Sequence, residues 1–486
     1  MQLTNTFIES MRSVLGEDGL RAYLISLEQE RTYGLRANPL KTTPAELKNL
    51  LPFLNESIPW CEEGFYFSSE YRPAKNVFYH AGLFYLQEPS AMLPAAAAQI
   101  LPGEKILDLC AAPGGKTTQA AGYLQGKGLI VTNDISASRA RALVKNCELS
   151  GITNYIALCE QPEKLAKRFP EFFDCVLVDA PCSGEGMYRK NPGMINEYLL
   201  SAEQIVSAQS NLINIAAQLT NPSGRIVYST CTFRLSENEE IINKFLTAHT
   251  DFYITPLNCK ALGIEQGFIE GTGRIWPHLQ KAEGHFVCVL QRRKTSIQLN
   301  SIQTENLNPK YHKLIKGNKF FPESKLKPFW DFCGNFVTGS AHSFKKCGSV
   351  ERRKRDAHPY TVFDDISDNK HFNLFGESLY LVPDGLPDLS GIRIARGGWY
   401  LGELKEKRFE PSQAFAIGLK KSDVTQVINY SYQNEEIIRY LKGESFEVDS
   451  SADGWNLVCV ENFPLGWGKI QNGRLKNKFQ QSWIMR

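Results

Sequence analysis

The chain has 486 residues, 42% of them hydrophobic and 22% charged, which excludes a disordered or collagen-like polypeptide and, at roughly 150 residues per domain, predicts about three domains. Its 12 cysteines include no Cys-x-x-Cys pair, so neither a zinc ribbon nor a thioredoxin-type motif is predicted and no metal is expected. The formal net charge is only +3 and no apolar run reaches the roughly 18 residues of a membrane-spanning helix, so we expect a cytoplasmic chain without a membrane partner.

The first 293 residues contain two different patterns. Residues 1–75 hold two helical patterns and a proline-rich connection, which predict a small α/β module. From about Glu104 to Gln291, apolar runs alternate with helical patterns. The strands predicted there are, in chain order, Lys105–Cys110, Leu129–Asp134, Tyr155–Cys159, Asp174–Asp179, Arg225–Thr230 and Phe286–Leu290. Because strands that alternate with helices of roughly 10 to 20 residues form parallel sheets, we predict a doubly wound α/β sheet.

Three helix starts are predicted from capping residues. Ser136 is expected to cap the helix that follows the second strand. Ser201 with Gln204, and Ser236 with Glu239, have the spacing of a capping box, in which each side chain bonds the backbone N–H of the other residue.

The C-terminal part of the chain is the more basic one. Up to Arg293 there are 27 Lys and Arg against 30 Asp and Glu, and from Lys294 onward there are 28 against 22. Residues 310–355 hold 12 basic side chains against 3 acidic ones in a poorly periodic stretch that is typical of a linker or insertion. From about Asn373, short strand patterns separated by turn residues predict a mostly β module. The excess of basic residues from Lys294 onward indicates a polyanionic partner such as nucleic acid. The alternative is that these charges belong to a solvated linker.

The first candidate site follows the first strand of the sheet. The segment Asp108–Thr118 (DLCAAPGGKTT) leaves this strand and enters a helix, and its glycines and small residues let a ligand approach the backbone at the helix N-terminus. It is not a P-loop, because Cys110 stands where that motif needs a glycine. Asp134, at the end of the second strand, is placed to accept the hydroxyls of a ribose bound over this turn. Its alternative role is to cap the helix after Ser136.

Two cysteines follow adjacent strands. Asp179–Gly186 (DAPCSGEG) ends the fourth strand, and Ser229–Phe233 (STCTF) ends the fifth. Because the carboxyl ends of parallel strands share one edge of a sheet, Asp179, Cys182 and Cys231 are predicted to converge there. A single strand cysteine is commonly an inert core residue, but two at adjacent strand ends indicate a functional pair.

Long motifs relate the chain to a known family. It resembles the Sun/NOL/NOP2 family of RNA cytosine-C5 methyltransferases, and within it the bacterial RsmF-like ribosomal RNA branch. The motifs that carry the resemblance are DLCAAPGGKTT (Asp108–Thr118), DAPCSGEGMYRK (Asp179–Lys190), STCTF (Ser229–Phe233), GLFYLQEPSA (Gly82–Ala91) and RIWPHLQKAEGHF (Arg274–Phe286). They cover about residues 30 to 290. The C-terminus resembles the PUA-like module of this branch, in GELK (Gly402–Lys405) and PLGWGK (Pro464–Lys469).

The resemblance implies a Rossmann-like class I methyltransferase fold and a catalytic role for three residues. It assigns to Cys231 the attack on carbon 6 of cytosine, and to Cys182 the release of the product. Covalent addition also fits the chemistry, because carbon 5 of cytosine is a poor nucleophile until a thiolate adds to carbon 6. Asp179 is expected to hydrogen-bond the N3 edge of the base and to stabilise the charge that develops there.

The cofactor that the resemblance implies is S-adenosyl-L-methionine. The turn residues expected to hold it are Cys110, Ala111, Ala112, Pro113, Gly114, Gly115 and Lys116. Asp134 is expected to hold its ribose hydroxyls, and Asp179 to line both the cofactor and the base. The family usually has an acidic or amide side chain near the adenine amine, after the third strand. Here spacing favours Gln161 and charge favours Glu160, so both are kept as candidates.

The predicted function is methylation of carbon 5 of a cytosine in RNA. The expected partner is small-subunit ribosomal RNA or the small ribosomal subunit, and the enzyme is expected to be a monomer. Since catalytic motifs do not encode which RNA is bound, a transfer RNA 5-methylcytosine methyltransferase is the alternative. A non-catalytic RNA-binding ribosome assembly factor is a second alternative, but such a protein would have no chemical need for two thiols beside an aspartate. The expected division is residues 1–75, an RNA-recognition-like α/β module; 76–293, the methyltransferase domain; 294–372, a basic linker or insertion; and 373–486, a PUA-like RNA-binding module.

Overall fold

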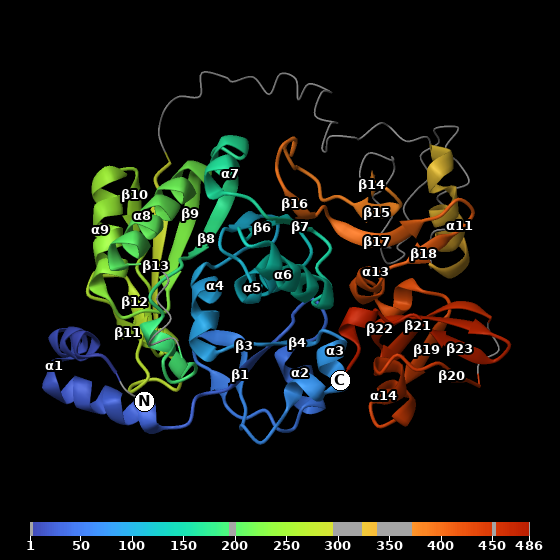
Figure 1. Ribbon diagram of the computed structural model, residues 1–486, viewed down its shortest axis with the longest axis horizontal. Helices are drawn as coiled ribbons and strands as arrows, with labels where there is room; N and C mark the ends of the chain where they lie inside the picture. The colour runs from blue at the N-terminus through green and yellow to red at the C-terminus, as the bar shows by residue number, and fades with distance from the viewer. Residues whose placement is uncertain (1–2, 194–200, 295–322, 338–371, 450–452, 486) are drawn as a thin grey trace.

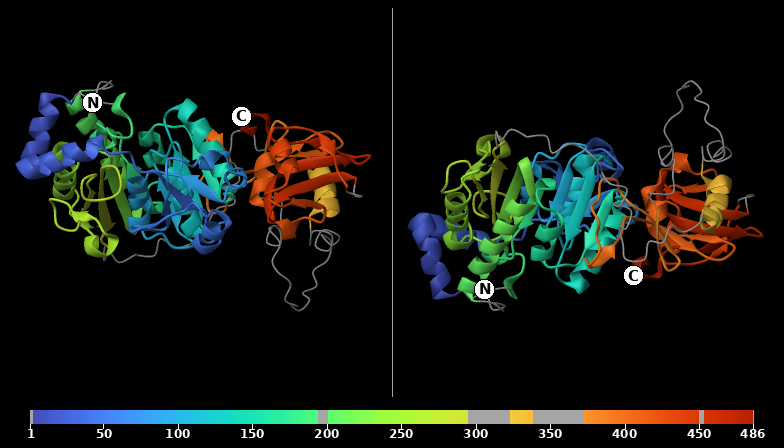
Figure 2. Two further views of the ribbon diagram at one scale, coloured as in Figure 1. Left: turned by 90° about the horizontal axis from the view of Figure 1, so that it is seen from below. Right: turned by 90° about the horizontal axis from the view of Figure 1, so that it is seen from above.

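The computed structural model describes residues 3–193, 201–294, 323–337, 372–449 and 453–485. A large sheet with helices on both faces lies next to a small N-terminal sheet (Figures 1 and 2). Helix α1 (Asn5–Glu28) lies at one end of the long axis, and the two C-terminal sheets lie at the opposite end. Within the described residues, no helix is both long and apolar enough to cross a membrane.

The N-terminal module is a four-stranded antiparallel sheet with three helices. Its elements are α1 (Asn5–Glu28), β1 (Gly34–Ala37), α2 (Pro44–Leu50), β2 (Ser57–Ile58), β3 (Cys61–Tyr66), α3 (Val77–His80) and β4 (Phe84–Leu86). The strand order is β2-β3-β1-β4, so the sheet takes its last strand from beyond residue 75. Helix α1 packs through Phe7 and Tyr23 on Tyr188 and Phe233 of the large domain. The module is therefore attached directly to the loops that carry the candidate catalytic residues.

The large sheet is doubly wound, as predicted. Its strands are β5 (Lys105–Asp108), β6 (Leu129–Asn133), β7 (Tyr155–Leu158), β8 (Phe173–Asp179), β9 (Thr220–Thr230), β10 (Phe252–Ile254), β11 (Glu265–Gln266), β12 (Gly273–Ile275), β13 (His285–Arg292) and β16 (Ile394–Arg396). They are ordered β11-β12-β13-β9-β8-β5-β6-β7-β16, with β10 paired to β13. Strands β5 to β9 are parallel, and β13 runs antiparallel to β9. All six predicted strands are present, with ends displaced by a few residues.

Helices cover both faces of this sheet. On one face lie α4 (Leu93–Ala97), α5 (Gly115–Leu124) and α6 (Ala137–Leu149), and on the other lie α7 (Pro162–Arg168), α8 (Ala202–Leu219) and α9 (Glu239–Ala248). A short helix, α10 (Cys259–Leu262), precedes β11. Along β13, Val287 and Val289 enter the first core, while Phe286 and Leu290 enter the second. This alternation is what a strand buried on both faces requires.

Two of the three predicted caps are confirmed. Ser136 caps α6 by accepting the backbone N–H of Arg139, and Ser201 forms its capping box with Gln204. The capping box predicted for Ser236 and Glu239 is wrong, because α9 begins at Glu239 itself and Ser236 lies in a short 3-10 turn. The Glu239 carboxylate instead accepts two hydrogen bonds from the buried Arg274, at 2.9 and 2.6 Å. A bidentate charged pair of this kind is stronger than a neutral capping bond.

The C-terminal part contains two further sheets. Its elements are α11 (Lys327–Phe336), β14 (Phe372–Phe375), β15 (Ser378–Leu381), β17 (Trp399–Leu404), β18 (Phe409–Pro411), α13 (Gln413–Gly418), β19 (Val427–Tyr430), α14 (Glu435–Leu441), β20 (Phe446–Glu447), β21 (Gly454–Val460), β22 (Phe463–Gln471) and β23 (Arg474–Asn477). The orders are β14-β15-β17-β18 and β19-β21-β22-β23-β20. Strand β16, which lies in the chain between β15 and β17 of the first of these sheets, instead pairs with β7 of the large sheet. Helix α11 lies in the range expected as a linker, yet packs through Phe332 on Phe409 and Trp467. Most of the basic stretch 310–355 lies outside the described residues.

Candidate active site

The two predicted cysteines meet at the carboxyl edge of the large sheet. Strands β8 and β9 run parallel, with Asp179 opposite Ser229, so the loops after them leave the sheet side by side. In these loops the sulfur atoms of Cys182 and Cys231 lie 3.4 Å apart, and both side chains are half-buried. This separation allows one thiol to donate a hydrogen bond to the other sulfur. The predicted convergence is thus observed.

Hydrogen bonds between the two loops hold the thiols in place. The backbone N–H of Gly186 donates to the carbonyl of Cys231 at 2.8 Å. Ser183 donates its backbone N–H to the buried Glu237 carboxylate at 2.9 Å, and its hydroxyl lies 2.5 Å from that of Thr232. Because these groups are buried, breaking any of the bonds would leave an unpartnered polar atom. The loop conformation, and with it the sulfur–sulfur distance, is therefore strongly determined.

A buried ion pair lies beside the thiols. The ammonium Nζ of Lys116 is 2.7 Å from Oδ2 of Asp179, and the Ser229 hydroxyl donates to Oδ1 at 2.9 Å. Burial opposes the charge on both groups, but Lys116 more than offsets it and lowers the pKa of Asp179. Asp179, together with Cys231, raises the pKa of Lys116 in the same way. Asp179 is therefore an anion and Lys116 a cation near neutral pH.

The surroundings keep the Cys182 thiol protonated. Hydrogen bonding to Cys231, followed by burial, raises the pKa of the Cys182 thiol well above its ordinary value. The S–H of Cys182 can therefore donate to the sulfur of Cys231, 3.4 Å away. Since the thiolate is the reactive form of cysteine, this arrangement favours Cys231 as the nucleophile of the pair.

His285 completes the cluster, and it was not predicted as a site residue. It is the first residue of β13, is 3% exposed, and places Nε2 4.0 Å from Oδ1 of Asp179. Within the described part of the chain, neither ring nitrogen has a hydrogen-bond partner. Burial and the charge of Lys116 lower the pKa of His285 to about 3, so the ring is neutral. His285 lies within one of the family-like stretches, Arg274–Phe286. It was not recognised as a site residue because a residue beside an apolar strand pattern is expected to belong to the core.

The turn between β5 and α5 fits the predicted cofactor. Gly114 has φ +111°, which an L side chain rarely adopts. A Cβ on Gly115 would come within 3.0 Å of Nε2 of Gln87, so a glycine is required where this side chain packs on the start of α5. At the end of β5, Oδ1 of the buried Asp108 has no hydrogen-bond partner among the residues that the structure describes. An unpartnered acceptor beside a helix N-terminus suits the ammonium and carboxylate of an amino-acid group.

Asp134 is tied to the same turn. One carboxylate oxygen accepts the backbone N–H of Ala112 at 3.3 Å, and the other accepts that of Ser136 at 3.0 Å. Arg139 approaches the first oxygen at 3.3 Å. The side chain is only 3% exposed. Asp134 thus shapes both the turn and the start of α6, and the oxygen that accepts from Ser136 keeps a second lone pair for a ligand hydroxyl.

The two candidates for the adenine contact differ in their surroundings. The carboxylate of Glu160 is buried and accepts hydrogen bonds from Lys164 at 3.3 Å and from the backbone N–H groups of Gln161 and Arg393. Burial works against its charge, but these bonds lower its pKa overall. Gln161 is exposed at the start of α7, where its side chain makes no capping bond. The amide of Gln161 is therefore the more available group.

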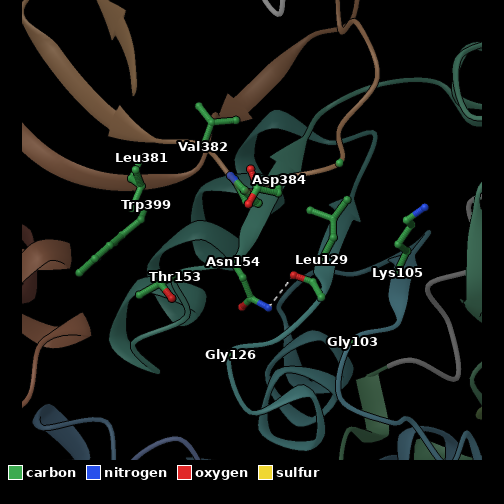
Figure 3. Close-up of a pocket in the computed structure, with 13 residues that line it drawn as sticks. Gly103, Lys105, Gly126, Leu129, Thr153, Asn154, Leu381, Val382, Asp384 and Trp399 are labelled. Atoms are coloured by element: carbon green, nitrogen blue, oxygen red, sulfur yellow. Dashed lines mark hydrogen bonds between the residues drawn. The ribbon is translucent and has the colours of Figure 1, made fainter. Parts of the chain in front are cut away.

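A separate cavity of about 530 Å³ lies at the opposite edge of the sheet. It is lined by Lys105 and Leu129, at the amino ends of β5 and β6, and by residues 381–385 and Trp399 of the C-terminal part (Figure 3). None of the predicted site residues lines it. It separates the large sheet from the C-terminal strands and is distinct from the catalytic edge.

Four family models match successive parts of the chain. Residues 3–89 match the N-terminal domain of 16S rRNA methyltransferase RsmF, and residues 96–291 match 16S rRNA methyltransferase RsmB/F. Residues 359–419 match the first C-terminal domain of the RsmF rRNA methyltransferase, and residues 428–485 match the methyltransferase RsmF PUA domain. Together these matches run from residue 3 to residue 485, and the longest gap between them is residues 292–358.

Full-length relatives and a solved structure agree with these matches. The ribosomal RNA small subunit methyltransferase F of an Escherichia coli strain is 30% identical over 98% of this chain and 94% of its own length. The protein of the same description from Erwinia tasmaniensis is 28% identical over 98% and 96%. The crystal structure of a methyltransferase homolog protein from Pyrococcus horikoshii is 27% identical, covers 60% of this chain and 95% of its own, and has a TM-score of 0.52.

Proposed function

The chain belongs to the RsmF family of 16S ribosomal RNA cytosine-C5 methyltransferases, and on that premise we propose how its residues carry out the reaction. The family is of the class I type that uses S-adenosyl-L-methionine, which when bound supplies a methyl group as an electrophile for carbon 5. The observation that carries the proposal is the 3.4 Å contact between Cys182 and Cys231, beside the Lys116–Asp179 ion pair.

In the first step, the Cys231 thiolate attacks carbon 6 of the target cytosine. A sulfur–carbon bond forms, the electron pair of the carbon 5–carbon 6 double bond moves into the ring, and negative charge builds on the N3 side. Lys116, a cation in electrostatic contact with Cys231, stabilises the thiolate before attack and offers donor hydrogens to N3 afterwards. Asp179, held ionised by Lys116, holds the N3 edge by accepting from the neighbouring amino group. Both groups are fixed before reaction, which is the condition for efficient stabilisation of charge.

His285 supplies a neutral donor to the same edge of the base. Its ring is buried against Asp179, carries one N–H, and has no partner in the protein for either nitrogen. A buried donor left unpartnered costs about 1–3 kcal/mol. A hydrogen bond from His285 to the charged O2–N3 side of the ring would recover that cost when the substrate is bound. His285 is therefore proposed as a further catalytic residue.

Cys182 releases the product. While Cys231 is a thiolate, the hydrogen bond between the sulfurs keeps the Cys182 proton in place. Once the sulfur of Cys231 is bonded to carbon 6, that stabilisation is lost, and Cys182 gives its proton to solvent. The Cys182 thiolate then takes the hydrogen of methylated carbon 5, the double bond re-forms, and Cys231 leaves as a thiolate. The balance is one hydrogen of cytosine replaced by a methyl group and one proton released.

The cofactor is assigned to the edge of the sheet beside this cluster. The turn from Cys110 to Lys116 would hold its amino-acid part and Asp134 its ribose, supported by the left-handed backbone of Gly114, by the Asp108 oxygen that has no partner among the described residues, and by the Asp134 oxygen that accepts only from Ser136 there. Gln161, the exposed amide after β7, is proposed for the adenine amine, with Glu160 shaping the loop. Asp179 lies between cofactor and base and would line both.

The remaining expectations are also proposals. We propose a cytoplasmic, monomeric enzyme, because its substrate is ribosomal RNA and its catalytic cluster is complete within one chain. We propose the division at residues 75, 293 and 372 with two changes: the N-terminal module extends through β4 to Leu86, and β16 belongs to the large sheet.

The test is methyl transfer from radiolabelled S-adenosyl-L-methionine to three substrates: small ribosomal subunits that lack the modification, naked 16S rRNA, and transfer RNA. Bisulfite sequencing then locates the modified base. Incorporation into the ribosomal substrates at a single cytosine supports the proposal. Incorporation into transfer RNA alone would support the alternative substrate, and no incorporation into any RNA would favour an assembly factor.

A further inference from the structure

A groove of about 500 Å³ runs over the N-terminal module and ends at the catalytic edge. Its walls come from the start of β1, the segment after β3 and the end of the catalytic loop. The residues used below are Arg31, Tyr33, Phe67, Tyr71, Lys75 and Lys190. A second depression of about 470 Å³ shares Arg31, Tyr33 and Phe67 and extends the groove toward Lys281.

An aromatic row forms the floor of the groove. The ring of Tyr33 lies 5.7 Å from that of Phe67, which lies 6.4 Å from Phe53, and Phe53 stacks on Tyr71 at 4.7 Å with only 20° between the planes. Tyr71 is nevertheless 44% exposed. Phe53 thus supports one face of a Tyr71 ring that remains largely open to solvent. Such supported, exposed rings are the platforms on which unpaired bases stack.

Cations border this row. Arg31, Arg72, Lys75 and Lys190 line the groove, and the guanidinium of Arg31 lies 4.7 Å from the centre of the Tyr33 ring. Among the residues that the structure describes, no acidic side chain is within ion-pair distance of Arg31, Lys75 or Lys190. Two carboxylates line the groove and its extension. Glu88 is buried and accepts from Ser90 and from the backbone N–H of Glu283, while Glu30 is exposed in the second depression. Against this one exposed carboxylate stand the four cations Arg31, Arg72, Lys75 and Lys190, so the net open charge is positive.

The groove is connected to the active site by direct contacts. Lys190 is the last residue of the segment that contains Asp179 and Cys182. Gln87, in the groove wall, packs on Gly115 of the cofactor turn. Glu88 bonds the backbone N–H of Glu283 at 2.8 Å, two residues before His285. The groove wall is therefore built on the same segments that carry the cofactor turn and His285, and Lys190 links it to the loop of Cys182.

We propose that this groove binds the single-stranded nucleotides of the substrate RNA that flank the target cytosine. Their bases stack on Tyr71 and Tyr33, and their phosphates lie against Arg31, Lys75 and Lys190. This inference rests on the proposed function and deepens it, because it assigns the RNA next to the reacting base to the N-terminal module. Unstacked flanking bases held in this way would also offset the cost of taking the target base out of its stack.

The test compares Tyr71 with a matched residue elsewhere. Tyr253, on β10, is 41% exposed and has Arg293 5.0 Å from its ring centre, so it reproduces the exposure and the cationic neighbour outside the groove. The probe is a fluorescein-labelled single-stranded RNA of about ten nucleotides containing one cytosine, with binding to the full chain measured by anisotropy. Tyr71→Ala should weaken binding on the order of tenfold, Tyr71→Phe should restore it, and Tyr253→Ala should change it little.

The charge is tested in parallel. Arg31→Ala should reduce the slope of log affinity against log salt by about 0.7, the value for one phosphate contact of a single strand, whereas Arg293→Ala should not. Unchanged binding of Tyr71→Ala, or equal weakening by Tyr253→Ala, overturns the proposal. So does competition by poly-glutamate as strong as that by unlabelled RNA, because the surface would then bind any anion. If the wild type binds RNA through Tyr71 but methylates none, the proposed function fails and the groove stands.

Discussion

Cysteines occupy two kinds of place on the same sheet. Cys175 lies inside β8 and Cys288 inside β13, both fully buried among apolar side chains. Burial raises the pKa of both thiols, that of Cys175 to about 12. Cys182, three residues beyond β8, and Cys231, directly after β9, instead contact each other beside the Lys116–Asp179 ion pair. The position relative to the strand end, rather than the residue type, decides whether a thiol is inert or reactive.

The strand ends differ from the strand interiors because the backbone ladder stops there. Inside β8 and β9 the N–H and C=O groups pair with neighbouring strands, and the apolar side chains enter the two cores on either face. Beyond Asp179 and Thr230 the loops must find other partners, and Glu237 and Ser183 supply them. A polar network assembled for this reason also provides the setting in which Lys116 and Asp179 remain charged.

The largest expected effect separates these two kinds of cysteine directly. Cys231→Ala should abolish methyl transfer, because no other group replaces the attacking sulfur. Cys175→Ala should cost about 1 kcal/mol of unfolding free energy from the small cavity, while methyl transfer persists. Initial rates with radiolabelled cofactor and urea unfolding curves measure the two effects. Substantial activity in Cys231→Ala would place the nucleophile elsewhere.

The next effect concerns the cofactor side of the edge. Asp134→Ala should weaken S-adenosyl-L-methionine binding by roughly 10- to 150-fold, the equivalent of a charge-assisted hydrogen bond of about 1.5–3 kcal/mol. Asp251→Ala, which removes a surface carboxylate paired with Arg292, is the control and should leave affinity unchanged. Calorimetry measures both. Equal affinity in Asp134→Ala and wild type would mean that Asp134 only shapes the turn and α6.

A smaller effect is expected at His285, where a substitution should lower activity but raise stability at acid pH. His285→Phe should lower the methylation rate about tenfold by removing a donor to the base, whereas His285→Gln retains part of the rate. His285→Phe should also raise the free energy of unfolding at acid pH. The pKa of His285 is about 3 in the fold against an ordinary 6.5, so the unfolded chain binds the extra proton and the wild type loses stability as pH falls from 6.5 toward 3.

His285→Phe should therefore gain on the wild type by about 1.4 kcal/mol for each pH unit in that window. Unfolding curves at pH 7 and pH 5 provide the readout. Parallel losses of activity and stability would contradict the assignment, because they would show that His285 only fills the core.

The sequence predicted the elements whose residues are close in the chain. Apolar periodicity predicted β5 to β9, and the positions of Cys182 and Cys231 at the carboxyl ends of two predicted parallel strands indicated that they would meet. It did not predict His285, since a histidine within an apolar strand has the pattern of a core residue. The Ser236–Glu239 cap failed because Glu239 has a partner in Arg274, 35 residues away in the chain. The aromatic row of the groove brings together Tyr33, Phe67 and Phe53 from separate segments. A pattern of neighbouring residues in the sequence cannot predict such a contact.

The roles of the two thiols are tested most directly by trapping the covalent species. Each variant is incubated with substrate RNA and S-adenosyl-L-methionine and run on a denaturing gel. Cys182→Ala should give a slow-migrating protein–RNA band, since attack and methylation proceed but the hydrogen of carbon 5 is not removed. Cys231→Ala and the double variant should give no such band. A band in Cys231→Ala would reverse the two roles, and full turnover by both single variants would show that neither thiol takes part in the reaction.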